Sequence, residues 1–398
     1  MRDHGGWRKA AAGAGLLAPD GSMTETIFAE MTALAARTGA INLGQGFPDE
    51  IGPAHVLEAA RAAIAAGTNQ YPPGRGTLEL RSAVSEHQKR FYGLDVAPET
   101  EVLATAGATE ALAATILALI EPGDEVLTFE PYYDAYGALI SLAGGVHTTV
   151  PLPWPHFEPD LDLLERAVTD KTRIILVNDP HNPTGTVFSA ATRELIVRLA
   201  EKHGATIVTD EVYEHLTFGV RHTPIATMPG AEGRTVTISS GGKTFNTTGW
   251  KIGWLTASSD LVDAILTVKQ YLTYSNGAPL QPAIAAGLRS NDRFFHELGP
   301  DLDRKRRLLN DGLRAAGFDV ADSAGTYFTV ADAAALGFDD AVEFCRVLPE
   351  RAGVIAVPIS AFVMPQHASD YSSLVRFAFC KRTEVLEQAV TQLAGLRR

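Results

Sequence analysis

The sequence predicts an α/β fold, with a large domain built on a mostly parallel sheet and a smaller α+β domain. From about residue 98 onward, short apolar runs alternate with longer segments of helical periodicity. The runs are rich in β-branched residues and nearly continuous in apolar character, as expected for strands buried on both faces. The alternation of such strands with helices is typical of a parallel sheet covered by helices.

The expected elements of the large domain follow one another in a regular order. Strands are expected within residues 101–107, 124–129, 172–178, 205–210 and 234–239. Helices are expected at 108–120, from about Tyr133, and at 189–204. Because parallel strands need a long crossover connection, these intervening helices support the parallel arrangement.

The C-terminal third changes character. From Asn291 to about Gly317 the pattern is that of one long charged helix, which Pro300 is expected to kink or divide. Shorter strands are expected at 327–330 and 375–379, with helices between and after them. The predicted organisation is an N-terminal extension (1–22), an N-terminal segment of the small domain (23–47), the large domain (48–290) and the C-terminal small domain (291–398).

Composition narrows the class of protein. The 398 residues are 45% hydrophobic and carry 34 basic against 47 acidic side chains, a formal net charge of -13. This charge disfavours nucleic acid and anionic membranes as partners. Cys345 and Cys380 are far apart, which gives neither metal-ligand spacing nor a disulfide framework. No apolar stretch approaches the roughly 18 residues of a membrane-spanning helix. We expect a cytoplasmic protein without a bound metal.

The N-terminal stretch from Trp7 to Pro19 places basic residues before small apolar ones. Its apolar part is short and broken by glycines, which fits a secretory signal poorly. We therefore expect a frayed extension.

Polar residues follow three predicted strands at the point where each ends. In open α/β sheets, ligands bind outside the carboxyl ends of the strands. Asn178 and Asn182 follow one strand, Asp210 ends the next, and Lys243 comes shortly after a third. Taken singly, these are ordinary turn residues, a helix cap and a loop lysine. Together with Tyr213 they match the needs of pyridoxal phosphate, which binds covalently to a lysine while a carboxylate pairs with its pyridinium nitrogen.

These residues lie in motifs that resemble those of a known family. The motifs are NLGQGFPDE, NQYPPG, EPYYDAY, PHNPTG, DEVYEHL, SSGGKTFNTTGWKIGW and VRFAFCK. From about Ile27 to its end, the chain resembles the class I aminotransferases of pyridoxal-phosphate fold type I. It is most similar to the branch with kynurenine, glutamine and methionine aminotransferases, and within it to the actinobacterial N-succinyldiaminopimelate aminotransferases. The resemblance implies a seven-stranded sheet in the large domain and an enzyme that transfers amino groups.

The resemblance also implies roles toward pyridoxal 5′-phosphate. Lys243 would bind the cofactor covalently and, once displaced by an amino acid, would carry a proton. Asp210 would keep the pyridine nitrogen protonated. Tyr213 and Asn182 would hydrogen-bond the phenolic oxygen, and Tyr133 would stack on the ring.

The phosphate group would bind at the start of a helix. The resemblance assigns this role to Gly107, Ala108 and Thr109, whose free N–H groups attract an anion, together with Ser240 and Lys251. It implies further that Tyr71 reaches the phosphate of the neighbouring subunit. The active enzyme would then be a homodimer with shared active sites.

For the amino acid donor and the 2-oxo acid acceptor, the resemblance assigns the α-carboxylate to Arg376, assisted by Gly46 and Asn178. The side-chain pocket would be formed by Phe28, Phe47 and the region around Tyr274, which favours a bulky neutral side chain or one with its charge far from Cα.

Two details bear on the substrate. We identify no second arginine that would dedicate the chain to aspartate. Thr109 stands where mammalian relatives carry an aromatic residue, which weakens a kynurenine-specific function.

Three functions of different classes are open at this point. The first is transamination between an amino acid and a 2-oxo acid. The second is a carbon–sulfur lyase, such as a cysteine-S-conjugate β-lyase, on the same fold. The third is a non-catalytic module of a transcription regulator, for which about 20 spare N-terminal residues are too few to form an attached helix-turn-helix domain.

Overall fold

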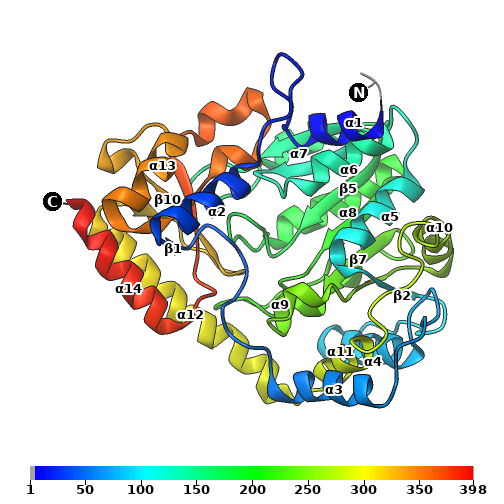
Figure 1. Ribbon diagram of the computed structural model, residues 1–398. Helices are drawn as coiled ribbons and strands as arrows, with labels where there is room; N and C mark the ends of the chain where they lie inside the picture. Colours follow the sequence, from blue (N-terminus) through cyan, green and yellow to red (C-terminus); the bar gives the residue numbers. More distant parts are fainter. Residues whose placement is uncertain (1–4, 398) are drawn as a thin grey trace.

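The computed structural model describes residues 5–397. Its centre is a seven-stranded sheet in the order β2-β8-β7-β6-β5-β3-β4 (Figure 1). The strands are β2 (Val102–Thr105), β3 (Glu125–Glu130), β4 (Val146–Pro151), β5 (Thr172–Asn178), β6 (Thr206–Asp210), β7 (Thr235–Ser240) and β8 (Gly253–Thr256). Only β8 runs antiparallel to its neighbours β2 and β7. The predicted α/β fold with a mostly parallel seven-stranded sheet is confirmed.

Alternate side chains of the sheet enter two different apolar cores. In β5, Ile174 and Leu176 belong to one buried cluster, and Ile175 and Val177 belong to the other. The first cluster includes residues of α5 (Gly107–Leu119), α6 (Ala135–Ala143) and α10 (Ser259–Lys269). The second includes residues of α7 (Leu161–Ala167) and α8 (Ala190–His203). Burial on both faces explains why the strand sequences are continuously apolar.

Two strands of the sheet were not predicted. β4 lies at the edge of the sheet, where most of its side chains are only partly buried, so its sequence VHTTVP lacks a continuous apolar run. β8 has only four residues and follows β7 without a full crossover helix. Its antiparallel direction allows this shorter connection.

A third group of helices covers the β2 side of the sheet. It consists of α3 (Ala54–Ala65), α4 (Leu78–Tyr92) and α11 (Gln281–Leu288), whose apolar residues cluster with Val102, Phe245 and Trp254.

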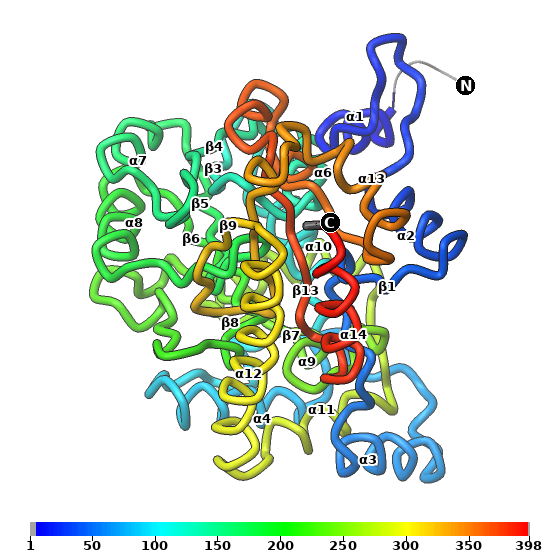
Figure 2. The backbone as a smooth tube through the Cα atoms, turned by 90° about the vertical axis from the view of Figure 1, so that its left-hand side faces the viewer, coloured from blue at the N-terminus to red at the C-terminus, as the bar shows by residue number. Residues whose placement is uncertain are grey.

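The C-terminal part forms a four-stranded antiparallel sheet in the order β12-β13-β10-β9. Its strands are β9 (Asp319–Val320), β10 (Phe328–Asp332), β12 (Val357–Pro358) and β13 (Leu374–Ala378). The helices around it are α12 (Asp292–Ala316), α13 (Ala341–Ala352) and α14 (Thr383–Leu393). Figure 2 shows α12 in yellow and α14 in red side by side.

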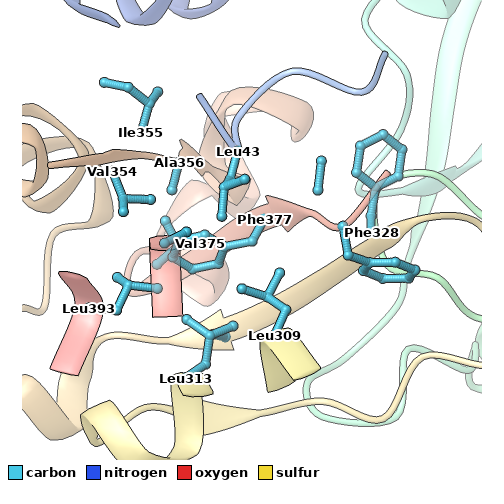
Figure 3. Packing of buried hydrophobic residues seen from close by; sticks show 14 of the residues in the cluster. Leu43, Leu309, Leu313, Phe328, Val354, Ile355, Ala356, Val375, Phe377 and Leu393 are labelled. Atoms are coloured by element: carbon cyan, nitrogen blue, oxygen red, sulfur yellow. The ribbon is translucent and has the colours of Figure 1, made fainter. Parts of the chain in front are cut away.

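The N-terminal segment packs with this C-terminal part. α2 (Ile27–Thr38) contacts α13, and β1 (Ile41–Asn42) pairs with β11 (Val354–Ile355) in parallel. Leu43 shares an apolar core with Leu309, Val375 and Phe377 (Figure 3). These contacts agree with a small domain assembled from both ends of the chain, and the boundaries given above stay a prediction.

Of the two outcomes expected at Pro300, a kink or a division of the long helix, the division is wrong. α12 is one helix of 25 residues that contains Pro300. Its N-terminal half buries Phe295 beside the large domain, and its C-terminal half buries Leu309 and Leu313 in the small-domain core. Packing along both halves offsets the roughly 3 kcal/mol that a proline costs inside a helix.

The expectation of a frayed extension is also wrong for the described residues. α1 (Gly6–Gly13) packs against α6, as Figure 1 shows. A Cβ on Gly13 would lie 2.1 Å from the Gly137 carbonyl oxygen, so the two backbones touch where both residues are glycine. Residues 1–4 lie outside the described part of the chain. Within the part described, no helix combines the length and the apolar character needed to cross a membrane.

Candidate active site

A cavity of about 350 Å³ opens at the carboxyl ends of β5, β6 and β7 and at the start of α5. Most of the residues predicted for the site line it: Gly46, Phe47, Gly107, Ala108, Thr109, Tyr133, Asn178, Asn182, Asp210, Tyr213, Ser240, Lys243 and Lys251. Phe28, Tyr71 and Arg376 do not line it, and neither does Tyr274, around which part of the side-chain pocket was expected.

The parallel register of the sheet brings the polar strand ends together. Asn178 ends β5 directly opposite Asp210 at the end of β6, and β7 runs parallel beside them. The Asn178 side chain fixes the turn that follows, because its Nδ2 donates to the Asp210 carbonyl at 2.8 Å and its Oδ1 accepts from the Asn182 N–H at 2.7 Å. Lys243 lies in α9 (Gly241–Thr244), immediately after β7.

Asp210 is buried, and only one of its carboxylate oxygens is satisfied. The Tyr136 hydroxyl donates to Oδ2 at 2.8 Å, whereas Oδ1 has no hydrogen-bond partner. Burial raises the pKa of Asp210 to about 6, and the hydrogen bond from Tyr136 opposes this rise. A buried acceptor without a donor is costly, so this oxygen is suited to a ligand that brings an N–H or O–H group.

The Lys243 amine lies among tyrosines. Its Nζ donates to the Tyr327 hydroxyl at 3.0 Å and lies 5.6 Å from the centre of the Tyr213 ring. Burial lowers the pKa of Lys243 below its ordinary value, although the negative charge of Asp210 opposes the shift. The amine is therefore easier to deprotonate than that of a surface lysine.

The start of α5 provides donors for an anion. Gly107 has a φ of +72°, and a Cβ there would lie 3.2 Å from the Lys251 side chain. Nζ of Lys251 lies 3.2 Å from Oγ1 of Thr109, to which it donates. Gly253 is also required, because a Cβ on it would lie 2.6 Å from the Gly107 carbonyl carbon. Free N–H groups at a helix start, with a lysine beside them, favour a phosphate group.

Arg376 lies next to the cavity and is buried. One guanidinium nitrogen donates to Asn182 Oδ1 at 3.0 Å, another donates to the Gly44 carbonyl at 2.7 Å, and Nε has no partner. Burial lowers the pKa of Arg376 to about 10, so it stays charged at neutral pH.

Aromatic rings surround this guanidinium. The rings of Phe328, Phe362 and Phe28 are centred 4.1, 4.7 and 5.7 Å from it. Phe28 thus lies beside Arg376, although it does not line the cavity. Tyr71 is separate from the cavity of its own chain: it is 83% exposed and packs edge-on against Tyr274.

Sequence reasoning missed several residues of the site. Tyr136 and Tyr327 contact Asp210 and Lys243, and Leu112, Val212, Gly242, Thr248 and Ile252 also line the cavity. Tyr136 is the third tyrosine of the EPYYDAY motif, which was the signal available. For Tyr327 we find no comparable signal, because a tyrosine before a strand is an ordinary core residue.

A second polar cluster lies apart from this cavity. His87, Glu214 and His215 place side-chain atoms suited to metal binding within 4.8 Å of one another. The two Nε2 atoms are 2.6 Å apart, which is a hydrogen-bond distance. The Glu214 oxygens accept from the hydroxyls of Tyr92 and Ser239. We therefore describe the cluster as a buried hydrogen-bond network.

Comparisons with known proteins agree with this geometry. The family model of class I and II aminotransferases matches residues 38–393. The chain is 50% identical over 380 residues to a probable N-succinyldiaminopimelate aminotransferase of Mycobacterium tuberculosis, covering 93% of this chain and 96% of that one. It is 37% identical over 372 residues to the methionine aminotransferase of Escherichia coli, again covering 93% and 96%.

A solved structure agrees as well. The structure of N-succinyldiaminopimelate aminotransferase from Mycobacterium tuberculosis superposes with a TM-score of 0.91 at 51% identity, covering 94% of this chain and 97% of that one. Fold, cavity and comparisons lead to one conclusion: the chain belongs to the class I and II aminotransferase family and is an aminotransferase.

Proposed function

We propose that this aminotransferase binds pyridoxal 5′-phosphate in the cavity and moves an amino group between an amino acid with a bulky or extended side chain and a 2-oxo acid. The main support is that Asp210 and Lys243 line the same cavity, and that one carboxylate oxygen of Asp210 is buried there without a hydrogen-bond partner.

The residues present fit this cofactor. A pyridinium N–H is the donor that Oδ1 of Asp210 lacks, and a negative Asp210 would hold that proton in place. The start of α5, with Thr109 and Lys251, suits the phosphate group. Tyr133 lines the same cavity, where its aromatic ring would stack on that of the cofactor. When bound, the cofactor supplies an electron sink that acidifies the Cα–H bond of the amino acid.

The chain's own groups would then bind the substrate and move its proton. Arg376 would hold the α-carboxylate, because its unpaired Nε and its two other nitrogens form the fork that carboxylates prefer. Lys243, once free, would take the proton from Cα, for which it must be neutral and close. Burial lowers the pKa of Lys243, which favours the neutral form.

The surroundings of Arg376 bear on the side chain of the substrate. Phe28, Phe328 and Phe362 surround the guanidinium with apolar surface, and Phe47 lines the cavity while remaining 48% exposed. An apolar pocket with an exposed edge suits a long side chain whose charge lies far from Cα. Together with the relatives' names, this favours N-succinyl-L,L-diaminopimelate as the donor and 2-oxoglutarate as the acceptor.

Other donors fit the same pocket. A neutral pocket separates related side chains by only about 1 to 3 kcal/mol per methylene, so methionine, glutamine and kynurenine remain candidates.

We also propose that the enzyme acts in the cytoplasm as a homodimer, in which the exposed Tyr71 completes the partner's site.

A panel of donors tests the proposal. The purified enzyme, loaded with pyridoxal 5′-phosphate, is mixed with each amino acid, and conversion of the cofactor to its pyridoxamine form is followed by absorbance. We expect conversion with N-succinyl-L,L-diaminopimelate and slower conversion with methionine or glutamine. Use of aspartate alone would contradict the bulky pocket. Pyruvate and ammonia are assayed in parallel, since their release without the pyridoxamine form would support a β-lyase instead.

A further inference from the structure

The Tyr327 hydroxyl joins two parts of the site. It accepts a hydrogen bond from Nζ of Lys243 at 3.0 Å and donates one to the Gly46 carbonyl oxygen. Its ring is packed edge-on against Tyr213, with ring centres 5.3 Å apart, and only 1% of Tyr327 is exposed. The Lys243 amine is thereby linked, through one oxygen, to the backbone of segment 44–47, of which Gly46 and Phe47 line the cavity.

Tyr327 and Arg376 both donate hydrogen bonds to the backbone of segment 44–47. Tyr327 immediately precedes β10, and Arg376 lies in β13, the antiparallel neighbour of β10. Arg376 donates to the Gly44 carbonyl, and Tyr327 donates to the Gly46 carbonyl two residues along. Arg376, which would bind the substrate carboxylate, and Tyr327, which holds the Lys243 amine, are therefore anchored to the same stretch of backbone, residues 44–46.

We propose that Tyr327 is a positioning residue, which holds the free amine of Lys243 at the Gly46 side of the cavity so that it can take the proton from the substrate's Cα. This inference rests on the proposed role of Lys243. Cα is bonded to the carboxylate that Arg376 would hold, so an amine held on the same side lies near the proton to be moved. A free lysine side chain has four rotatable bonds, and ordering it without a partner costs conformational entropy.

Removing the hydroxyl has a defined consequence for the amine. A hydrogen bond accepted from an ammonium group is stronger than one accepted from a neutral amine, so Tyr327 favours the charged form of Lys243. Without this hydroxyl, a larger fraction of the Lys243 amine is neutral. The amine then reacts faster with a small electrophile. The positioning effect acts in the opposite direction on catalysis, because a neutral but misplaced amine transfers the proton more slowly.

The experiment compares Tyr327→Phe with Tyr371→Phe. Tyr371 is an equally buried tyrosine whose hydroxyl bonds to the backbone carbonyls of Glu130 and Leu152, away from the cavity. Both variants lose one buried hydroxyl that bonds to a backbone carbonyl oxygen, so a difference between them at Lys243 reports the contact of the Tyr327 hydroxyl with that amine. Thermal unfolding is measured first, and we expect the two midpoints to agree within a few degrees. A Tyr327→Phe protein that unfolds far below Tyr371→Phe would indicate a structural role and overturn the inference.

The first readout needs neither cofactor nor substrate. The cofactor-free proteins are labelled briefly with acetic anhydride, and peptide mass spectrometry gives the acetylation rate of Lys243 relative to the exposed Lys251. We expect Tyr327→Phe to raise this ratio roughly 3- to 10-fold, the equilibrium effect of one hydrogen bond, and Tyr371→Phe to leave it unchanged. Equal ratios in the two variants would overturn the inference.

The second readout is the deuterium isotope effect on the donor half-reaction. The donor carries ²H at Cα and is whichever of N-succinyl-L,L-diaminopimelate and L-methionine converts the wild type faster. In Tyr327→Phe we expect kcat to fall about 10-fold, KM to change less than twofold, and the isotope effect to rise because proton transfer becomes slower than the other steps. An unchanged isotope effect with a raised KM would overturn the inference. A wild-type protein that converts no donor would instead contradict the proposed function, while the acetylation result would still stand.

Discussion

The Tyr136 hydroxyl lies 2.8 Å from Oδ2 of Asp210 and donates to it, while Oδ1 of the same carboxylate has no partner. One oxygen is therefore fixed by the protein, and the other is available to a ligand. Burial favours the protonated form of Asp210 and raises its pKa to about 6 from the ordinary value of 3.8. Because Asp210 is ionised and buried at neutral pH, it lowers the free energy of unfolding there.

A pH titration of stability checks this relationship. Because the folded-state pKa of Asp210 is raised, the cofactor-free fold binds its proton more tightly than the unfolded chain, and the contribution is lost as pH rises from about 4 to about 6. At roughly 1.4 kcal/mol per pKa unit, the loss is at most about 3 kcal/mol. We expect Asp210→Asn to remove it, so that the variant gains stability relative to the wild type between pH 4 and pH 7 in urea unfolding. The surface variant Asp263→Asn is the control. If both variants show the same pH dependence of stability, the pKa of Asp210 is not raised in the folded state.

Lys243 is predicted to carry the cofactor. Reduction with borohydride after loading with pyridoxal 5′-phosphate should leave a pyridoxyl adduct that peptide mass mapping finds on Lys243. The nearby Lys251 is an internal control, since it lies beside Thr109 at the other end of the site. An adduct on Lys251 in the wild type would show that the two lysines have been assigned the wrong way round.

Arg376→Lys is expected to weaken the use of every amino acid donor. Lysine has a single side-chain nitrogen, which cannot reach both Asn182 and Gly44 while also holding a carboxylate through two parallel hydrogen bonds. We expect kcat/KM to fall on the order of 10²-fold, as for the loss of a buried charged pair. The conservative surface change Arg289→Lys, at an exposed pair with Glu86, should leave kcat/KM within twofold. A similar loss for both variants would remove Arg376 from the site.

Tyr71 is predicted to act across a subunit boundary, since it is exposed and lies outside the cavity of its own chain. Lys243→Ala and Tyr71→Ala chains should each be nearly inactive. After they are mixed and allowed to exchange subunits, hybrid dimers would contain one intact site, and part of the activity should return. If subunits exchange but activity does not return, Tyr71 acts in the site of its own chain or in none. Tyr271→Ala, which changes another exposed tyrosine, is the control.

The sequence was sufficient where one local pattern decides the structure. β5 spans the whole predicted run 172–178, and its central residues Ile174–Val177 are apolar because they alternate between two buried cores. Asp210 and Lys243 were found because Asp210 ends one strand and Lys243 comes shortly after the next, and parallel strands bring their carboxyl ends to one edge. The sequence missed β4 and β8, whose short or half-exposed segments carry no such pattern.

By itself, then, the sequence determined the α/β alternation, the family and the polar residues at the strand ends, since these depend on periodicity and on the order of motifs along the chain. Tertiary structure alone decided that Tyr136 satisfies one oxygen of Asp210, that Tyr327 holds Lys243, and that α12 continues through Pro300. The physical reason is the same in each case. Each of these features is stabilised by contacts between residues far apart in the chain, and a local sequence pattern does not indicate which distant residues will be in contact.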